Sequence, residues 1–254
     1  MQPITITYPH TAISAEALPL EPRQVWSVAQ TVRSQLVVDA LVRKLEVEHA
    51  FERASAFRVN GVSFSVHWDL EHDLYGEGEV PVMGMTEFDP AEPHSIYVSV
   101  NGKILGGHME LLRSTTAHEF GHVVFDAPGW VRHGVGLRAV NFADVPAGRP
   151  AKARKRPFDA RELRANEFMG ALLVPPALLR VDFQRLAKRY RFAASERPSA
   201  IFRGSPAYEA ARLDEDALAE VHVALAERYG VSESFIRVRL SRYDLLRTGM
   251  SYAV

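Results

Sequence analysis

The segment TTAHEFGHVVFDAPG, residues 115–129, constrains the fold of this chain more than any other stretch. It carries His118 and His122 four positions apart, with Glu119 directly after the first histidine, in an otherwise apolar run. The pattern predicts a helix over residues 107–125 that ends before the sequence DAPG. This helix is apolar around most of its circumference, so its three polar side chains must lie in or beside a core and need strong partners there.

Two interpretations account for the pattern. In the first, the histidines bind one metal ion, because residues four apart on a helix point the same way within about 40°. Glu119 lies on the flank, poorly placed as a ligand but able to act as a general base, as in the His-Glu-x-x-His motif of zinc peptidases. In the second, a buried helix satisfies its polar groups without metal, and the motif arises by chance, as in roughly three of a hundred such chains. The cost of burying three polar groups favours the metal site.

A zinc site needs a third protein ligand and leaves a fourth position open. Metzincins place a further histidine six positions after the second one, but Pro128 stands there, and His133 lies outside that spacing. The third ligand is therefore expected on a second predicted helix, residues 159–174. This helix offers Asp159, Glu162 and Glu167.

A helical wheel separates these carboxylates. One apolar stripe must face the core; it consists of Ala165, Phe168, Met169, Leu172 and Leu173. Glu162 borders this stripe, with Asn166 one turn further on. Glu167 lies nearly opposite, beside Arg164, where we expect solvent. Glu162 is therefore the predicted third ligand.

Small residues indicate that the two helices pack closely. On the first helix they form a strip beside the histidine face, and on the second they lie near Glu162. They are Ser114, Ala117 and Gly121 on the first helix, and Ala165 and Gly170 on the second. A close contact of this kind would bring a carboxylate of the second helix to an ion held by the first.

The part of the chain before this helix reads as helix followed by sheet. Residues 21–54 predict one helix or two. Three β-like runs at 62–70, 81–89 and 95–100, separated by turn compositions, predict a small, mostly antiparallel sheet of three strands. The strand at 95–100 could align an extended peptide by edge pairing. Residues 127–158 read as irregular, and their basic run KARKR as a solvated loop, with a nucleic-acid contact as the alternative.

The C-terminal segment, residues 216–244, predicts two helices joined by a turn at Gly230, with Ser232 as the N-cap of the second helix. Basic residues on the second helix allow a DNA-recognition interpretation; they are Arg237, Arg239 and Arg242. Acidic residues nearby offset this charge and favour a packed helical pair without nucleic acid. They are Asp214, Glu215, Asp216, Glu220, Glu227 and Glu233.

Composition excludes several classes of protein. The chain has 254 residues, a net charge of -1 and no cysteine. It therefore lacks the charge of a nucleic-acid or membrane binder, and it cannot form disulfides or thiolate metal sites. The start MQPITITYPH is unlike a signal peptide, and no apolar run is long enough to span a bilayer. We expect a cytoplasmic protein without a membrane partner, with a first domain over residues 1–176 and a helical subdomain over 177–254.

Two motifs together resemble the ImmA/IrrE metallopeptidases of bacteria and mobile elements. These motifs are TTAHEFGHVVF and ELRANEFMGALLVP. The second is similar to the family pattern Glu-x-x-(Ala/Cys)-Asn-x-(Phe/Ala)-Ala-Ala-x-Leu-Leu-x-Pro, with matches at Glu162, Ala165, Asn166, Phe168, Leu172, Leu173 and Pro175. The chain departs from the pattern at Met169 and Gly170, where two alanines are usual, and in the long gap between the motifs. A weaker similarity extends over about residues 80–246.

The resemblance implies an α+β fold: a minimal zincin-like metallopeptidase domain, with a small sheet packed on helices, followed by a C-terminal helix-turn-helix-like segment. It implies a zinc endopeptidase with His118, His122 and Glu162 as metal ligands and Glu119 as the general base, although these ligands also suit Mn²⁺ or Fe²⁺. The implied substrate is a helix-turn-helix transcriptional repressor, cut in stress or mobile-element regulation. The alternative is a DNA-binding transcriptional regulator with a sensory or structural metal site.

Overall fold

The computed structural model describes residues 2–8, 20–37, 39, 42–46, 50–51, 54–70, 73–74, 81–134, 138–142 and 160–248. The chain divides into two compact units. Unit 1 comprises Met1–Ala40 and Glu46–Leu172, and unit 2 comprises Leu41–Leu45 and Leu173–Val254. The fold is mixed α/β, with a small sheet packed with helices, which is consistent with the predicted α+β class. The run KARKR and Asp159 lie outside the described residues.

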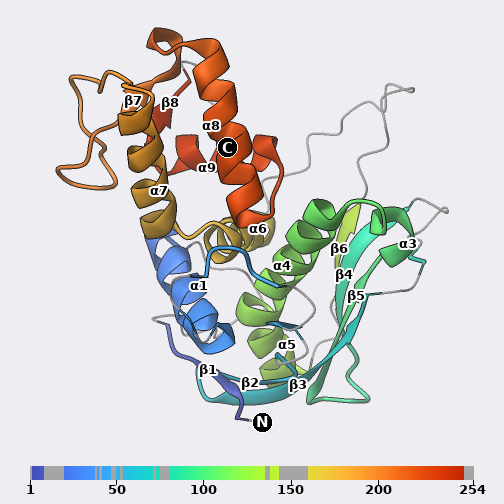
Figure 1. Ribbon diagram of the computed structural model, residues 1–254. Helices are drawn as coiled ribbons and strands as arrows, with labels where there is room; N and C mark the ends of the chain where they lie inside the picture. The colour runs from blue at the N-terminus through green and yellow to red at the C-terminus, as the bar shows by residue number, and fades with distance from the viewer. Residues whose placement is uncertain are drawn as a thin grey trace. The chain divides into compact units, whose positions relative to one another are not determined.

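The described part of unit 1 contains a six-stranded mixed sheet in the order β1-β2-β3-β5-β4-β6. The strands are β1 (Ile4–Ile6), β2 (Ala56–Val59), β3 (Val62–Asp69), β4 (Val82–Phe88), β5 (Ser95–Val100) and β6 (Arg138–Phe142). Neighbours β1/β2 and β3/β5 are parallel, while β2/β3, β5/β4 and β4/β6 are antiparallel. Figure 1 shows the sheet curving along one side of the unit's helices.

The three predicted strands exist as β3, β4 and β5, and the sheet is mostly antiparallel as predicted, but the predicted number of three strands is wrong. The prediction missed β1 and β2, which have three and four residues and are too short to give a clear alternating pattern. It also missed β6, which lies in the region predicted to be irregular. The predicted edge strand, β5, lies between β3 and β4, so its backbone is already paired on both sides and cannot align an added peptide.

Unit 1 contains the two helices that carry the sequence motifs. Its helices are α1 (Pro22–Leu36), α3 (Gly102–Leu105), α4 (Met109–Phe125), α5 (Ala127–His133) and α6 (Ala160–Leu173). The ranges of α4 and α6 differ from the predicted ones by no more than two residues. Of the one or two helices expected over residues 21–54, the first ends at Leu36, because Val37 is extended; Ala50 and Phe51 are helical again. In the region expected to be irregular, α5 follows α4 directly and ends at Gly134, whose left-handed φ of 62° terminates it.

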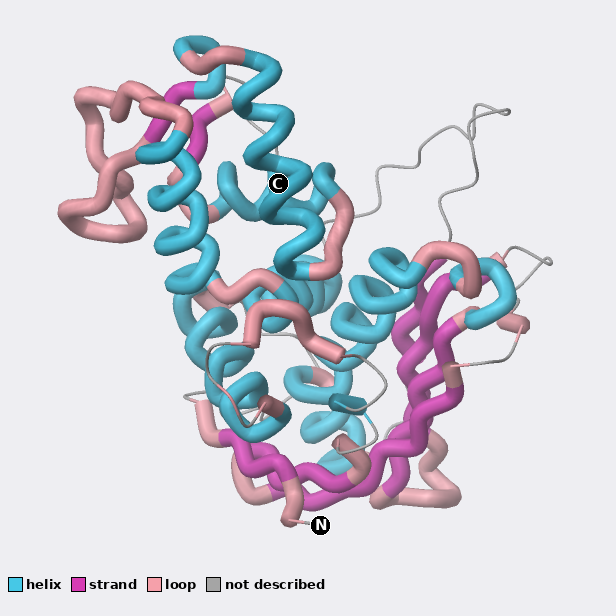
Figure 2. Tube along the Cα trace, in the orientation of Figure 1, coloured by secondary structure: helices cyan, strands magenta, loops and turns pink. Residues whose placement is uncertain are grey.

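Helix α4 lies in the core of unit 1, with the sheet on one side and α6 on another (Figure 1). Phe120 is fully buried, and its ring lies 5.4 to 5.6 Å from those of Phe51, Phe57, Trp68 and Phe168. Figure 2 shows the helices of this unit on the inner side of the curved sheet. The apolar environment of α4 therefore comes from both neighbours, as the apolar circumference of this helix predicts.

Unit 2 is mainly helical. Its elements are α7 (Pro176–Arg189), η1 (Ala210–Arg212), α8 (Glu215–Tyr229), α9 (Glu233–Arg242) and the parallel strand pair β7 (Tyr208–Glu209) and β8 (Leu246–Arg247). The predicted helix pair is confirmed as α8 and α9. Gly230 ends α8 in the left-handed conformation, with a φ of 65°. The hydroxyl of Ser232 caps α9 by accepting a hydrogen bond of 3.2 Å from the backbone N–H of Phe235.

The arginines that the sequence places on α9 do not all lie at the surface. Arg239 is buried, with 5% of its surface exposed, and its guanidinium lies over the Phe235 ring. Arg237 is exposed and pairs with Glu233 at 3.5 Å. Arg239 is therefore not available at the surface for a DNA contact. DNA binding by this helix pair stays the untested alternative to a packed helical pair.

Among the described residues, no helix is both long and apolar enough to cross a lipid bilayer.

Candidate metal centre

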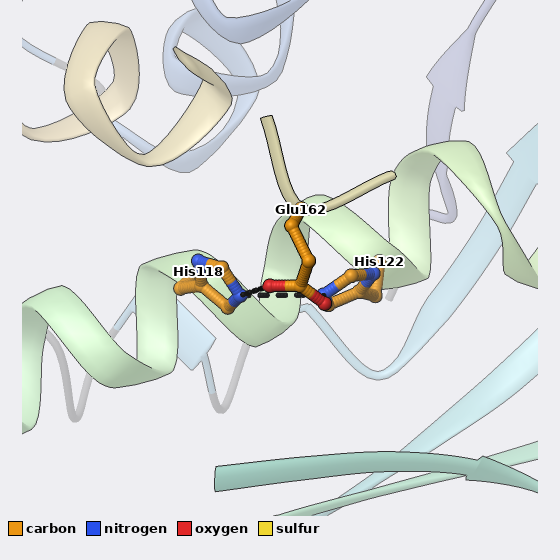
Figure 3. A group of neighbouring side chains, drawn as sticks. All are labelled: His118, His122 and Glu162. Atoms are coloured by element: carbon orange, nitrogen blue, oxygen red, sulfur yellow. Dashed lines mark hydrogen bonds and ion pairs between the residues drawn. The ribbon is translucent and has the colours of Figure 1, made fainter. Parts of the chain in front are cut away.

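Three side chains from two helices converge in unit 1. His118 and His122 extend from α4, and Glu162 points towards them from the first turn of α6 (Figure 3). The two imidazole Nε2 atoms lie 3.3 Å apart. The Glu162 carboxylate lies 3.2 Å from Nε2 of His118 and 3.5 Å from Nε2 of His122. This group could hold a metal ion.

The separation of the two histidine nitrogens matches the one expected around a tetrahedral zinc ion. Ligand bonds of about 2.0–2.1 Å at tetrahedral angles place ligand atoms about 3.3 Å apart. The two Nε2 atoms are 3.3 Å apart, and each lies near a different oxygen of Glu162, Oε2 at 3.2 Å from His118 and Oε1 at 3.5 Å from His122. The structure thus brings together the three residues that helix geometry and the motif resemblance select. It places His133 on α5, exposed to solvent, and Glu167 is not part of the group.

Outer partners orient both imidazoles with Nε2 towards the centre. Nδ1 of His118 lies 3.2 Å from Oδ1 of Asn166, and Nδ1 of His122 lies 2.8 Å from Oδ2 of Asp126. Both partners offer oxygen acceptors, so Nδ1 of each ring can donate to its partner, and Nε2 would be the ligand atom once a metal ion replaces the proton there. Such outer hydrogen bonds are typical of histidines that bind metals.

The charges of the centre favour a cation. Burial alone would lower the pKa of His122, but its hydrogen bond to Asp126 and the nearby carboxylates raise this pKa to about 9. Burial alone would raise the pKa of Glu162, but the hydrogen bond from His118 and the charges of both histidines lower it. Both shifts describe one attraction: the carboxylates stabilise positive charge at His122, and the positive imidazoles stabilise the ionised form of Glu162.

Glu119 lies beside this group without joining it. Its side chain is fully buried between α4 and β4, and the hydroxyl of Thr86 donates a hydrogen bond of 2.8 Å to Oε2. Within the described residues, Oε1 has no hydrogen-bond partner. Burial raises the pKa of Glu119, and the two histidines and Thr86 offset part of this rise. A carboxylate with a raised pKa and one unengaged oxygen is suited to accept a proton.

Strand β4 approaches Glu119 closely, a contact that is not among those predicted from the sequence. A Cβ atom at Gly84 would lie 2.7 Å from Oε1 of Glu119 and 2.8 Å from Cγ2 of Thr115. The pairing of β4 with β6 is irregular between Val82 and Gly84. A glycine inside a predicted strand often marks a close approach of another group, so Gly84 was an available signal. Nothing in the sequence indicated that Thr86 would donate a hydrogen bond to Glu119.

The close packing predicted for α4 and α6 is confirmed at its centre. A Cβ atom at Gly121 would lie 2.7 Å from Cα of Ala165 and 3.2 Å from its carbonyl oxygen. Only a hydrogen side chain at Gly121 lets the two backbones come this near. Because Glu162 is one turn before Ala165 on α6, this contact sets the distance of its carboxylate from the histidines.

The prediction that Arg164 and Glu167 face solvent is wrong. Both are buried, with 4% and 5% of their surfaces exposed. Arg164 pairs with Asp126, and Glu167 accepts a hydrogen bond of 3.0 Å from Nε1 of Trp26 on α1. The helical wheel assumes that only one face of α6 packs against a neighbour, whereas α1 covers a second face of this helix. The spacing of apolar residues along α6 does not by itself predict this packing.

Comparison with models of protein families gives no match, and neither does a comparison with curated proteins. The resemblance of the two motifs to ImmA/IrrE metallopeptidases therefore stays a prediction.

Replacing Glu162 with alanine should remove most of the metal from the protein. Zinc sites with four ligands bind with about 10–16 kcal/mol, so one ligand accounts for about 3 kcal/mol, or about 100-fold in affinity. We would measure metal content after purification without added metal. Glu110→Ala is the control, since it removes an exposed carboxylate from the first turn of α4. Equal metal occupancy in wild type and Glu162→Ala would contradict the assignment of this ligand.

Proposed function

We propose that this protein is a zinc-dependent endopeptidase with a zincin-like catalytic domain. His118, His122 and Glu162 would hold the metal, and Glu119 would act as the general base. One observation carries the proposal: a fully buried carboxylate, with Oε1 unpartnered among the described residues, lies beside three converging ligand atoms. Catalytic zinc sites use three protein ligands, and His with Glu is one of their common sets. Mn²⁺ and Fe²⁺ also accept these ligands.

The chemistry follows from the positions of the side chains. A bound zinc ion would supply Lewis-acid activation of a peptide carbonyl and of water. Glu119 would take the proton of the attacking water at Oε1, since Oε2 is held by the Thr86 hydroxyl at 2.8 Å. The raised pKa of this carboxyl allows it to hold the proton and pass it to the leaving amine. The buried surroundings keep bulk water away from the exchange.

The substrate class rests on the motif resemblance alone. A helix-turn-helix transcriptional repressor, cut during stress or mobile-element regulation in the cytoplasm, is the substrate that this resemblance implies. The helix pair α8 and α9 of unit 2 belongs to the same proposal as a helix-turn-helix-like segment. The geometry of the metal centre itself supports hydrolysis of a peptide bond without selecting a partner.

Glu119→Gln tests the proposal. The amide keeps the size of the side chain and an acceptor for Thr86 but cannot take a proton, so we expect full zinc content and at least about 100-fold less cleavage. Cleavage would be measured as new N-termini in a peptide library of broad sequence coverage, incubated with zinc-loaded protein. Glu167→Gln is the matched control, since Glu167 is also a buried carboxylate and accepts a hydrogen bond of 3.0 Å from Nε1 of Trp26.

Each outcome decides between the alternatives. New termini that wild type and Glu167→Gln produce and Glu119→Gln does not would support the peptidase. If wild type gives no termini beyond those of Glu119→Gln, the peptidase proposal fails. A metal that only holds helices together, or one that only senses for a DNA-binding regulator, leaves any activity insensitive to Glu119→Gln.

A further inference from the structure

Arg164 and Asp126 form a buried ion pair next to the metal centre. Their side chains are 3% and 6% exposed, and Nη2 of Arg164 contacts Oδ1 of Asp126. Burying such a pair in place of apolar side chains is often neutral or unfavourable for stability. Its presence therefore calls for a role besides stability. The inference that follows rests on the proposed metal centre.

The pair reaches the centre through His122. The second oxygen of Asp126, Oδ2, lies 2.8 Å from Nδ1 of His122. Each carboxylate oxygen thus has a different partner, which fixes both the position and the rotation of the carboxylate. Asp126 follows the last residue of α4, so without Arg164 its side chain would be held by His122 alone among these contacts.

The guanidinium of Arg164 is itself held in place. It lies 5.2 Å from the centre of the Phe125 ring, within the range of a cation–π contact. The Phe125 ring packs against Tyr8 at 5.2 Å and against Phe168 at 5.7 Å. The hydroxyl of Tyr8 donates a hydrogen bond of 3.0 Å to the carbonyl of Val124. Aromatic packing around the end of α4 therefore restricts the movement of the Arg164 guanidinium.

Arg164 also belongs to the helix that carries the third ligand. It follows Glu162 by two positions on α6, so the two side chains leave the helix about 200° apart. Glu162 reaches the histidines directly, and Arg164 reaches His122 through Asp126. Helix α6 thus contacts the centre by two separate routes.

We propose that Arg164 is a positioning residue for the metal centre. By holding Asp126, it keeps His122 in the tautomer and ring orientation that present Nε2 to the metal. It also couples the placement of His122, on α4, to that of Glu162, on α6. Changes of such outer partners typically weaken metal affinity by about 10–100-fold.

The test compares the zinc affinity of full-length variants. Arg164→Met keeps the length of the side chain and removes the charge, and we expect its zinc Kd to rise about 10–100-fold, measured by competition with a chelator. The visible spectrum of the Co²⁺-loaded variant should also change, because His122 is no longer held in one orientation. Arg164→Lys keeps a charge for Asp126, so it should restore part of the affinity. Thermal unfolding of the metal-free proteins reports stability separately.

Arg161→Met is the matched control. Arg161 is on the same helix, and its charge acts on Asp126 from a distance. We expect a zinc Kd and a Co²⁺ spectrum close to those of wild type. If Arg161→Met shows the same zinc Kd and Co²⁺ spectrum as Arg164→Met, the effect comes from net charge and the inference fails.

The remaining outcomes separate the inference from the proposed function. Wild-type affinity and spectrum in Arg164→Met overturn the positioning role and leave the metal centre intact. If Arg164→Met does not fold, Arg164→Gln, which removes the charge but keeps a polar side chain, decides: a wild-type Kd and spectrum in this variant overturn the role, and a raised Kd with a changed spectrum supports it. Failure of wild type to bind zinc removes the metal centre, and the proposed function and this inference fail together.

Discussion

Gly121→Ala should both destabilise the protein and remove its metal. The new Cβ atom would lie 2.7 Å from Cα and 3.1 Å from Cβ of Ala165, so α4 and α6 must separate. Overpacking of this kind costs about 1–3 kcal/mol, more than the gain of up to about 1 kcal/mol from the higher helix propensity of alanine. As α6 moves, the Glu162 carboxylate leaves its position, 3.2 and 3.5 Å from the two histidines. Loss of that ligand should raise the zinc Kd by about 100-fold.

Denaturant unfolding and chelator competition would measure these two effects. Gly107→Ala is the control, because a Cβ atom at Gly107 meets nothing within 4 Å. In a double variant, Ala165→Gly should restore only part of the loss, since it removes the contact with Cβ but not those with Cα and the carbonyl oxygen. Wild-type stability and zinc affinity in Gly121→Ala would show that the helices are not in contact at this point.

Gly84→Ala should reduce catalysis while sparing the metal. Its Cβ atom would lie 2.7 Å from Oε1 and 2.8 Å from Cγ of Glu119, and 2.8 Å from Cγ2 of Thr115. The side chain of Glu119 must move, and with it the oxygen proposed to take the proton. General bases contribute about 10²–10⁴-fold to rate, so kcat/KM should fall within that range towards the value of Glu119→Gln. The ligands do not contact the new methyl group, so zinc content should stay at the wild-type level.

The decisive measurement for Gly84→Ala is kcat/KM at confirmed zinc content, on a peptide cut by wild type. Full activity at full zinc content would contradict the placement of Glu119 against β4. Loss of zinc together with activity would mean that β4 supports the ligands as well as the base. Gly107→Ala is again the control, because it adds the same methyl group at a position where nothing lies within 4 Å.

Local periodicity was sufficient to predict the helices of the centre. Two histidines one turn apart can share a face of α4 whatever surrounds them. The apolar stripe of α6 placed Glu162 at the border of the core, where the structure has it beside both histidines. Small side chains at Gly121 and Ala165 indicated a close helix contact, because only backbone approach explains their pairing. The first two of these inferences depend on residues within a few turns of one helix.

The partners of the centre depended on contacts between distant segments. Thr86 and Glu119 are 33 positions apart, and Trp26 and Glu167 are 141 apart. No local pattern indicates that β4 packs on the base or that α1 covers the outer face of α6. For the same reason, the mixed order of the sheet, with β5 in its interior, could not be read from the individual strands.

By itself, the sequence determined which side chains could bind a metal, since the spacing along a helix decides which of them share a face. The tertiary structure decided how those side chains are held. Asp126 and Arg164 orient His122, Thr86 and Gly84 confine Glu119, and α1 buries the face of α6 that its own period assigned to solvent. The physical reason is that hydrogen bonding and burial of polar groups are set by neighbouring elements, and the identity of those neighbours is a property of the packed core.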